Sequence, residues 1–265
     1  MFSANSHTFA VCAYKESEYL EQCVASLKNQ TAKSKIIMCT ATDNDKIRAV
    51  AKKYDLELFV NSNKPSICGD WNFAMSNCDT ELVTLAHQDD VYEPDYLENA
   101  IKALNLATDP IMFFSSYSEL RNGQKVYSNK LLNIKKFMLS PLKIKAFWKS
   151  KFIRRRILAL GNAICCPSVT YVIAKTGKEP FCSTMKSNLD WEQWEVFSKL
   201  TGSFVYLAKP LMSHRIHEES TTSAIIADNT RTKEDYEIYR KFWPDFIAKF
   251  LTKQYQKSEK SNESK

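Results

Sequence analysis

Short apolar runs alternate with segments of helical periodicity in the first part of the chain. Four apolar runs have the composition of strands buried on both faces of a sheet; they span residues 8–14, 35–40, 56–60 and 81–86. The segments that follow them predict helices over residues 20–27, 47–54, 69–77 and 97–104. Ser17 suits the N-cap of the first helix, and Pro94 the first turn of the last. This alternation predicts an α/β fold with a mostly parallel, doubly wound sheet.

The pattern changes beyond the fourth helix. Asn122 and Gly123 lie between two strand-like segments and are a strong signal for a tight hairpin. Residues 130–160 interleave basic and apolar side chains, and residues 189–223 predict a helix, a strand and a polar loop rich in His, Arg and Ser. The chain closes with predicted helices, broken at Pro244, and a polar tail.

Two adjacent carboxylates, Asp89 and Asp90, directly follow the fourth apolar run. Sheets of this kind hold ligands at the carboxyl ends of their strands. Neighbouring carboxylates repel each other unless a cation or hydrogen bonds stabilise their charge. Mg²⁺ and Mn²⁺ prefer such oxygen ligands and often bridge a carboxylate to substrate phosphates. The pair therefore indicates a metal and phosphate site, or else it caps the next helix in solvent.

Composition narrows the class of protein. A chain of 265 residues with 44% hydrophobic and 12% aromatic content can bury a full core, which excludes disordered and collagen-like proteins. With five glycines and no GxxxxGK[ST] or GxGxxG motif, neither a P-loop nor a dinucleotide fingerprint is present. Eight cysteines without a CxxC pair favour reduced core residues. No secretory or membrane-spanning apolar run occurs, so we expect a cytoplasmic protein.

The positive charge is concentrated in one segment. Residues 120–178 contain 14 Lys or Arg and no Asp or Glu, so the rest of the chain carries −7 of the net +7. Three interpretations remain open: a solvated lysine-rich face, a surface for anionic lipids, or a nucleic-acid site. The interleaved Leu, Ile, Phe and Trp favour the lipid surface, and no recognised nucleic-acid-binding motif is present. We therefore expect no nucleic-acid partner.

Three separated stretches carry a resemblance to a known family. They are AVCAYKESEYLEQCVASLKNQT (10–31), LVTLAHQDDVYEP (82–94) and LDWEQWEVFSKLTGSFVYLAKPLMSHRIHEES (189–220). In this order they resemble the inverting family 2 glycosyltransferases, of the bacterial surface-polysaccharide type. The resemblance implies a GT-A fold, a Rossmann-like and mostly parallel sheet flanked by helices, here with a basic helical insertion and C-terminal helices. It also implies sugar transfer from a nucleoside diphosphate, most simply a UDP-sugar, to a saccharide or lipid-linked acceptor in cell-surface polysaccharide or glycolipid synthesis.

The same resemblance assigns the reacting groups. It implies a Mn²⁺ or Mg²⁺ site at Asp89, Asp90 and His217, and a general base at Asp190. Its late loop motif corresponds to Arg215, His217 and Ser220. These roles suit the chemistry, because the attacking hydroxyl must lose a proton while the departing diphosphate gains negative charge. The structural alternatives are a helix cap at Asp190 and a loop hydrogen bond at His217.

A further set is expected to bind the donor: Ala13, Tyr14, Glu16, Thr40, Asp70, Asn72, His87, Gln88 and Arg215. Two of these positions depart from the family pattern. Thr40 stands where an acid often helps to bind uracil, and His87 where the acidic motif has its first acid. Asp70 and Asn72 also suit a helix start, and Trp191 and Trp194 suit core packing. These departures keep an alternative open, a non-catalytic GT-A-like module that binds nucleotide or lipid at a membrane surface.

We expect a single GT-A domain with two halves and a C-terminal extension. We expect residues 1–120 to form the nucleotide-sugar-binding half of a single GT-A domain. Residues 121–224 are expected to form the acceptor-side half, including the basic segment 130–160. Residues 225–265 would be a C-terminal helical extension and tail. A location on the inner face of the plasma membrane would accompany a lipid-binding role for the basic segment.

Overall fold

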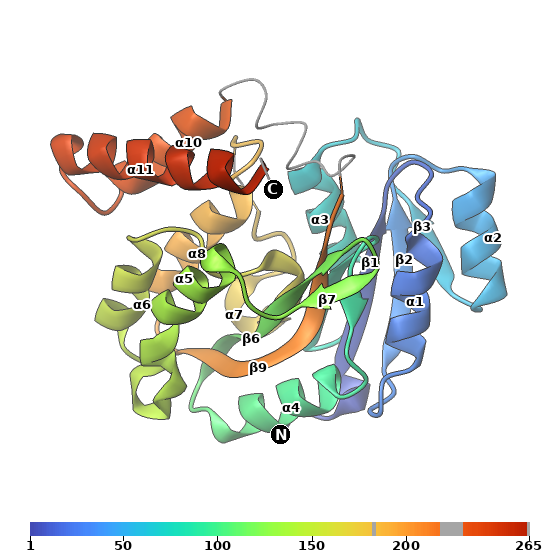
Figure 1. The fold of residues 1–265 in the computed structure, drawn as a ribbon. Helices are drawn as coiled ribbons and strands as arrows, with labels where there is room; N and C mark the ends of the chain where they lie inside the picture. The colour runs from blue at the N-terminus through green and yellow to red at the C-terminus, as the bar shows by residue number, and fades with distance from the viewer. Residues whose placement is uncertain (182–183, 218–229, 264–265) are drawn as a thin grey trace.

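The computed structural model in Figure 1 describes residues 1–181, 184–217 and 230–263. Within these residues, nine strands form one mixed sheet, and helices flank it on both sides. The expected α/β fold class is confirmed.

The first part of the chain forms the parallel portion of the sheet, as the apolar runs predict. Its strands are β1 (His7–Ala13), β2 (Lys35–Thr40), β3 (Glu57–Val60) and β4 (Leu82–His87). After the short turn η1 (Ala4–Ser6), its helices are α1 (Leu20–Lys28), α2 (Asp45–Lys53), α3 (Ile67–Ser76) and α4 (Tyr96–Leu106). Strands β1 and β4 are continuous apolar runs and are buried almost throughout, whereas β3 lies at the edge of the sheet and is partly exposed.

Two predicted helix starts are wrong. The N-cap of α1 is Tyr19, and the hydroxyl of Ser17 accepts a hydrogen bond from the Tyr19 amide at 3.2 Å, so Ser17 lies outside the helix. Asp95 is the N-cap of α4, which places Pro94 before the helix and not in its first turn. In both cases the N-cap lies a residue or two further along the chain than the sequence pattern indicates.

The second part of the chain adds strands of both directions. They are β5 (Val91–Tyr92), β6 (Pro110–Arg121), β7 (Gln124–Val126), β8 (Val169–Val172) and β9 (Ser203–Ile216). The longer helices are α5 (Lys130–Met138), α6 (Lys151–Leu158), α8 (Leu189–Lys199), α10 (Thr230–Arg240) and α11 (Asp245–Glu263). The short ones are η2 (Ser140–Lys143), η3 (Lys145–Phe147), η4 (Cys166–Ser168) and α7 (Ile173–Thr176). The predicted hairpin forms between β6 and β7, where Asn122 (φ 48°) and Gly123 (φ 78°) both adopt the positive φ that this turn requires.

The order of strands in the sheet is β3-β2-β1-β4-β8-β6-β9-β5, with β7 beside β6. The four neighbouring strands β3, β2, β1 and β4 are parallel to one another, and β6 is parallel to β9. Strand β8 is antiparallel to both of its neighbours, and β5 is antiparallel to β9. The parallel portion therefore holds the carboxyl ends of β1, β2 and β4 at one edge, where a ligand site is expected.

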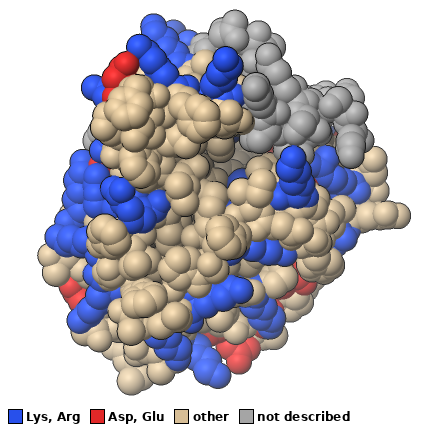
Figure 2. All heavy atoms as spheres, turned by 60° about the vertical axis from the view of Figure 1, so that its left-hand side comes forward, with Lys and Arg blue, Asp and Glu red and all other residues tan. Residues whose placement is uncertain are grey.

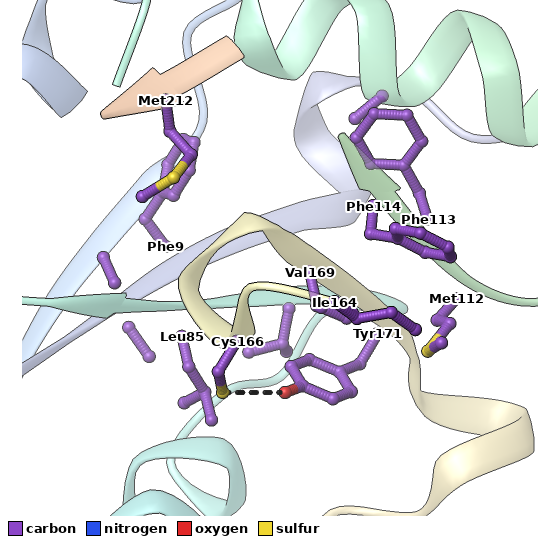
Figure 3. Packing of buried hydrophobic residues seen from close by; sticks show 14 of the residues in the cluster. Phe9, Leu85, Met112, Phe113, Phe114, Ile164, Cys166, Val169, Tyr171 and Met212 are labelled. Carbon is purple, nitrogen blue, oxygen red and sulfur yellow. Dashed lines mark hydrogen bonds between the residues drawn. The ribbon is translucent and has the colours of Figure 1, made fainter. Parts of the chain in front are cut away.

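Side chains from four strands meet in the core. Figure 3 shows Phe9 of β1, Phe113 of β6, Tyr171 of β8 and Met212 of β9, all of them buried. Trp191 and Trp194 are fully buried, which confirms that they pack in the core. The seven cysteines in the described part of the chain are free thiols, whereas Cys182 lies outside it.

The basic segment does not form one continuous surface. Arg154 is buried and donates from Nε to the Ser198 carbonyl (2.9 Å), from Nη1 to the Gly202 carbonyl (2.7 Å) and from Nη2 to Leu200. The guanidinium thus satisfies the carbonyls where α8 ends and the chain turns into β9. Trp148 is buried as well. Arg154 and Trp148 therefore belong to the core and cannot contribute to a lipid surface on the basic segment.

Candidate active site

A cavity of about 520 Å³ opens at the carboxyl ends of β1, β2 and β4. Eight of the residues expected in the site line it: Ala13, Tyr14, Thr40, Asp70, His87, Gln88, Asp89 and Asp190. Five do not form part of its wall: Glu16, Asn72, Asp90, Arg215 and His217. Ser220 lies outside the described residues.

The end of β1 is fixed to the turn that follows β4. The side chain of Gln88 accepts a hydrogen bond from the Tyr14 amide through Oε1 and donates to the Tyr14 carbonyl through Nε2, both at 2.9 Å. This pair of bonds leaves the Tyr14 ring, which is half-exposed, at the mouth of the cavity. Thr40 lies beside them and accepts a hydrogen bond from the Thr42 amide at 3.0 Å. The three residues thus form one wall of the cavity.

Helix α3 carries two polar candidates, of which Asp70 lines the cavity and Asn72 does not. Asp70 lines the wall and accepts a hydrogen bond from Asn61 Nδ2 at 2.9 Å; burial raises the pKa of its carboxyl. Asn72 instead pairs with the backbone of Phe181, donating to the carbonyl at 2.7 Å and accepting from the amide at 3.0 Å. Glu16 is exposed outside the cavity. Asn72 therefore fixes the backbone at Phe181, and Glu16 lies outside the cavity wall; their roles in donor binding stay predictions.

His87 is a neutral part of the cavity wall. Its ring stacks on the indole of Trp71, with centroids 5.0 Å apart and planes 25° from parallel. Burial lowers the pKa of His87, although the charges of Asp90 and Asp89 oppose this effect. The position that usually carries an acid therefore supplies a flat, uncharged ring.

Asp89 and His217 form a pair next to the cavity. Asp89 lines the wall, and its Oδ2 lies 3.1 Å from Nε2 of His217. The His217 ring also packs edge-on against Tyr19, with a centroid distance of 5.1 Å. Burial raises the pKa of Asp89, but the neighbouring histidines, His214 foremost, outweigh this effect and lower the pKa. Asp89 is therefore ionised and faces the cavity.

Asp90 points to the other side of the same turn. Its carboxylate is fully buried, and Oδ1 accepts hydrogen bonds from His214 Nδ1 (3.0 Å) and from the Arg215 amide (2.9 Å). Arg215 in turn donates from Nε to the Asp89 carbonyl at 2.8 Å and lies over the Tyr19 ring. Asp90 and Arg215 therefore hold the turn against β9. Neither side chain lines the cavity, and their predicted metal and donor contacts stay predictions.

Asp190 reaches the cavity from the first turn of α8. Its Oδ2 accepts a hydrogen bond from Asn162 Nδ2 (2.8 Å), and its Oδ1 from the Trp191 amide (2.7 Å). Burial raises the pKa of the carboxyl, and the two hydrogen bonds oppose this rise. The N-cap of α8 is Asn188, so Asp190 does not act as the helix cap. The structure brings Asp190 and Asp89 to one cavity from different elements.

Several cavity residues escaped the sequence analysis. Tyr117, Lys135, Asn162, His214 and Arg231 all line the wall. His214 precedes Arg215 in β9, and alternation along the strand could have placed the two side chains on opposite faces. Nothing in the sequence separates Lys135 from the lysines around it, because its place in the cavity depends on a hydrogen bond to Tyr117 of β6.

A family model places the chain among known proteins. The model described as Glycosyl transferase family 2 matches residues 8–170, more than half of the chain. The chain belongs to glycosyltransferase family 2. This glycosyltransferase is 25% identical over 247 residues to uncharacterised glycosyltransferases of Rickettsia typhi and Rickettsia prowazekii, with 91% of this chain and 71% of each relative covered.

Solved structures show the same fold as this glycosyltransferase. S. aureus TarS 1–349 in complex with UDP-GlcNAc has a TM-score of 0.62 at 16% identity, covering 93% of this chain and 70% of that one. The mannosyltransferase PcManGT from Pyrobaculum calidifontis, in complex with GDP-Man and Mn²⁺, has a TM-score of 0.60 at 12% identity, covering 93% and 69%. These likenesses confirm the GT-A fold of this chain.

Proposed function

We propose that this protein transfers a sugar from a nucleoside diphosphate to a hydroxyl of a saccharide or lipid-linked acceptor, with inversion at the anomeric carbon, in the synthesis of a cell-surface polysaccharide or glycolipid. The observation that carries the proposal is the convergence of Asp89 and Asp190 on one cavity. Further support comes from two proteins of the same fold whose structures contain UDP-GlcNAc and GDP-Man. Residues 1–120 would bind the donor and residues 121–224 the acceptor, with residues 225–265 as an extension.

The residues present fit a divalent cation that binds together with the donor. Asp89 and His217 offer one oxygen and one nitrogen ligand, whereas no group of three or more His, Cys, Asp or Glu side chains gathers in the described residues. Mn²⁺ and Mg²⁺ often bind through one or two protein groups, with substrate phosphates and water completing their shell. When bound, the ion would compensate the charge of the departing diphosphate. PcManGT, which has the same fold, contains Mn²⁺.

Asp190 is assigned the role of general base. In a single displacement, the acceptor oxygen forms a bond to the anomeric carbon as the bond to the diphosphate oxygen breaks. The hydroxyl proton passes to the Asp190 carboxylate, and the configuration inverts because attack and departure occur on opposite faces. A raised pKa makes this carboxylate a better proton acceptor than an exposed aspartate. Asn162 and the Trp191 amide fix its orientation.

The variant Asp190→Asn tests the assignment. We expect sugar transfer to fall about 10²–10⁴-fold, because the amide cannot accept the proton. Donor affinity should stay within about twofold of wild type, because the carboxylate acts on the acceptor. Transfer assays and calorimetry with a panel of nucleoside-diphosphate sugars, with and without Mn²⁺, measure the two quantities. Glu192→Gln, on the same helix but paired with Lys241, is the matched control; an equal loss of binding and transfer would remove Asp190 from the base role.

One observation favours the alternative of a nucleotide-binding module without turnover. His87 replaces an acid with a neutral ring, which lowers the negative charge available for a cation. Such a module would bind nucleoside diphosphates in the cavity, yet neither transfer nor hydrolyse any sugar donor in the panel. The same experiments therefore separate the two functions.

An anionic membrane surface is the proposed partner of the face formed by α5, α6 and α11. Figure 2 turns this side of the molecule forward and shows many Lys and Arg side chains, in blue, around uncharged residues, in tan. Four phenylalanines on these helices, here called the phenylalanine face, are largely exposed: Phe137, Phe152, Phe246 and Phe250. In the described part of the chain, no helix has the length and apolar character needed to cross a bilayer. Contact would therefore be made by these side chains and the surrounding cations.

A further inference from the structure

Lys135 presents a cation to the cavity that no carboxylate of the described residues neutralises. Its Nζ donates a hydrogen bond to the Tyr117 hydroxyl at 3.0 Å and lies over the same ring, and it forms no ion pair within the described chain. Burial raises the pKa of Tyr117 to about 12, so the partner is a neutral phenol. An ammonium group has three N–H donors, and two of these remain for a ligand. A partly buried cation with a neutral partner is stabilised by binding an anion.

The position of Lys135 indicates which substrate it meets. Lys135 and Asp190 line the same cavity, and Lys135 comes from α5 in the second part of the chain, which is expected to form the acceptor side. The other two cations of the wall, Lys186 and Arg231, also come from the second part of the chain. The diphosphate of the donor is instead expected at Asp89 and His217.

We propose that Lys135, supported by Tyr117, binds an anionic group of the phosphate class carried by the acceptor. This inference rests on the proposed sugar transfer and names the class of acceptor. An anion bound beside Asp190 would make its carboxylate harder to ionise, and the ammonium of Lys135 offsets this effect. The donor diphosphate is a second source of the same chemistry, and the experiment has to separate the two.

Calorimetry with three probes tests the proposal. Glycerol 3-phosphate, glycerol and UDP are titrated into the protein with Mn²⁺, the first two also after saturation with UDP. Lys135→Met removes the charge and keeps much of the length, Lys135→Arg keeps the charge, and Lys143→Met is the control at an exposed lysine of the basic segment. We expect Lys135→Met to weaken glycerol 3-phosphate binding about tenfold or more, and Lys135→Arg to restore part of it. Glycerol binding and UDP affinity should not depend on the variant.

The outcomes are distinct. A loss of UDP affinity in Lys135→Met, with glycerol 3-phosphate binding unchanged, would assign the ammonium to the donor and overturn the proposal. So would equal binding of glycerol 3-phosphate by all variants, or none by wild type. If wild type binds glycerol 3-phosphate through Lys135 but binds no nucleotide, the proposed transfer fails while the anion site stands. If Lys135→Met does not fold, as judged by urea unfolding, Lys135→Gln takes its place in the same titrations.

Discussion

Two opposing effects set the pKa of the Asp190 carboxyl group. Burial destabilises its charged form and raises the pKa, whereas the hydrogen bonds from Asn162 and the Trp191 amide stabilise the charged form. A general base works only while it is unprotonated. The balance between burial and hydrogen bonding therefore sets the acidic limit of the proposed reaction.

Asn162→Ala shifts this balance in a predictable direction. Removing the Nδ2 donor leaves the carboxylate less stabilised, so the pKa of Asp190 rises further. A hydrogen bond of about 0.5–1.5 kcal/mol corresponds to a shift of roughly half to one pH unit. The acidic limb of a profile of kcat/KM against pH should move to higher pH by this amount. An acidic limb at the wild-type position would show that Asn162 does not influence the base.

Neighbouring residues in this site face opposite ways, and this limits what the sequence can assign. The family motifs predicted that Asp89, Asp190 and His217 belong together, and the structure places Asp89 and Asp190 on one cavity with His217 bonded to Asp89. The same motifs could not tell Asp89 from Asp90, because the orientation of each carboxylate depends on β9. That strand supplies the two hydrogen bonds which turn Asp90 inward.

At the scale of elements, α10 holds the loop that leads into the base. The carboxylate of Glu234 accepts hydrogen bonds from the backbone amides of Lys186 (2.6 Å), Ser187 (2.9 Å) and Asn188 (3.1 Å). Asp235 accepts a further one from the Asn188 side chain at 2.7 Å. These loop residues line the cavity shortly before Asp190. Helix α10 therefore positions the acceptor side of the cavity through charged hydrogen bonds.

Glu234→Ala should destabilise the fold and reduce transfer together. One buried and two partly buried backbone donors lose the buried carboxylate that accepts their hydrogen bonds, which we expect to cost about 3 kcal/mol. Urea unfolding measures the free energy of unfolding, and transfer assays at low temperature measure the remaining activity of the folded protein. Glu237→Ala, an exposed residue on the same helix, is the control and should leave both unchanged. A loss of stability no larger than that of the control would contradict the role of α10.

Helices, strands and turns could be predicted where the sequence pattern that determines them is local. The four parallel strands and their helices follow from apolar runs and helical spacing, and the hairpin at Asn122 and Gly123 follows from the turn itself. The direction of β8 was not predictable, because an antiparallel strand between β4 and β6 depends on pairing with segments distant in the chain. Buried Arg154 is a similar case, since its three carbonyl acceptors come from the α8–β9 connection.

Over the whole molecule, the part of the chain beyond residue 120 contributes both to the cavity and to the phenylalanine face. Helix α5 contributes to both, because Lys135 lines the cavity while Phe137 is 77% exposed. A membrane bound at the phenylalanine face would lie beside the helix that brings Lys135 to the cavity, and we propose that a lipid-linked acceptor reaches Asp190 from this side. This arrangement connects the proposed lipid-linked acceptor with the basic composition of residues 120–178.

The variant Phe152→Glu with Phe250→Glu tests membrane contact directly. Each phenylalanine is expected to contribute about 1.5–3 kcal/mol when buried in a lipid interface, and each added glutamate repels anionic headgroups. Binding to vesicles of phosphatidylcholine with phosphatidylglycerol should therefore fall by more than about tenfold in a sedimentation assay. Leu106→Glu, at an exposed apolar residue of α4, should bind as wild type does.

Wild-type binding should also weaken as salt increases, since screening reduces the attraction between the lysines and the lipid. Failure of the wild-type protein to bind these vesicles at physiological salt would leave the phenylalanine face without a lipid role.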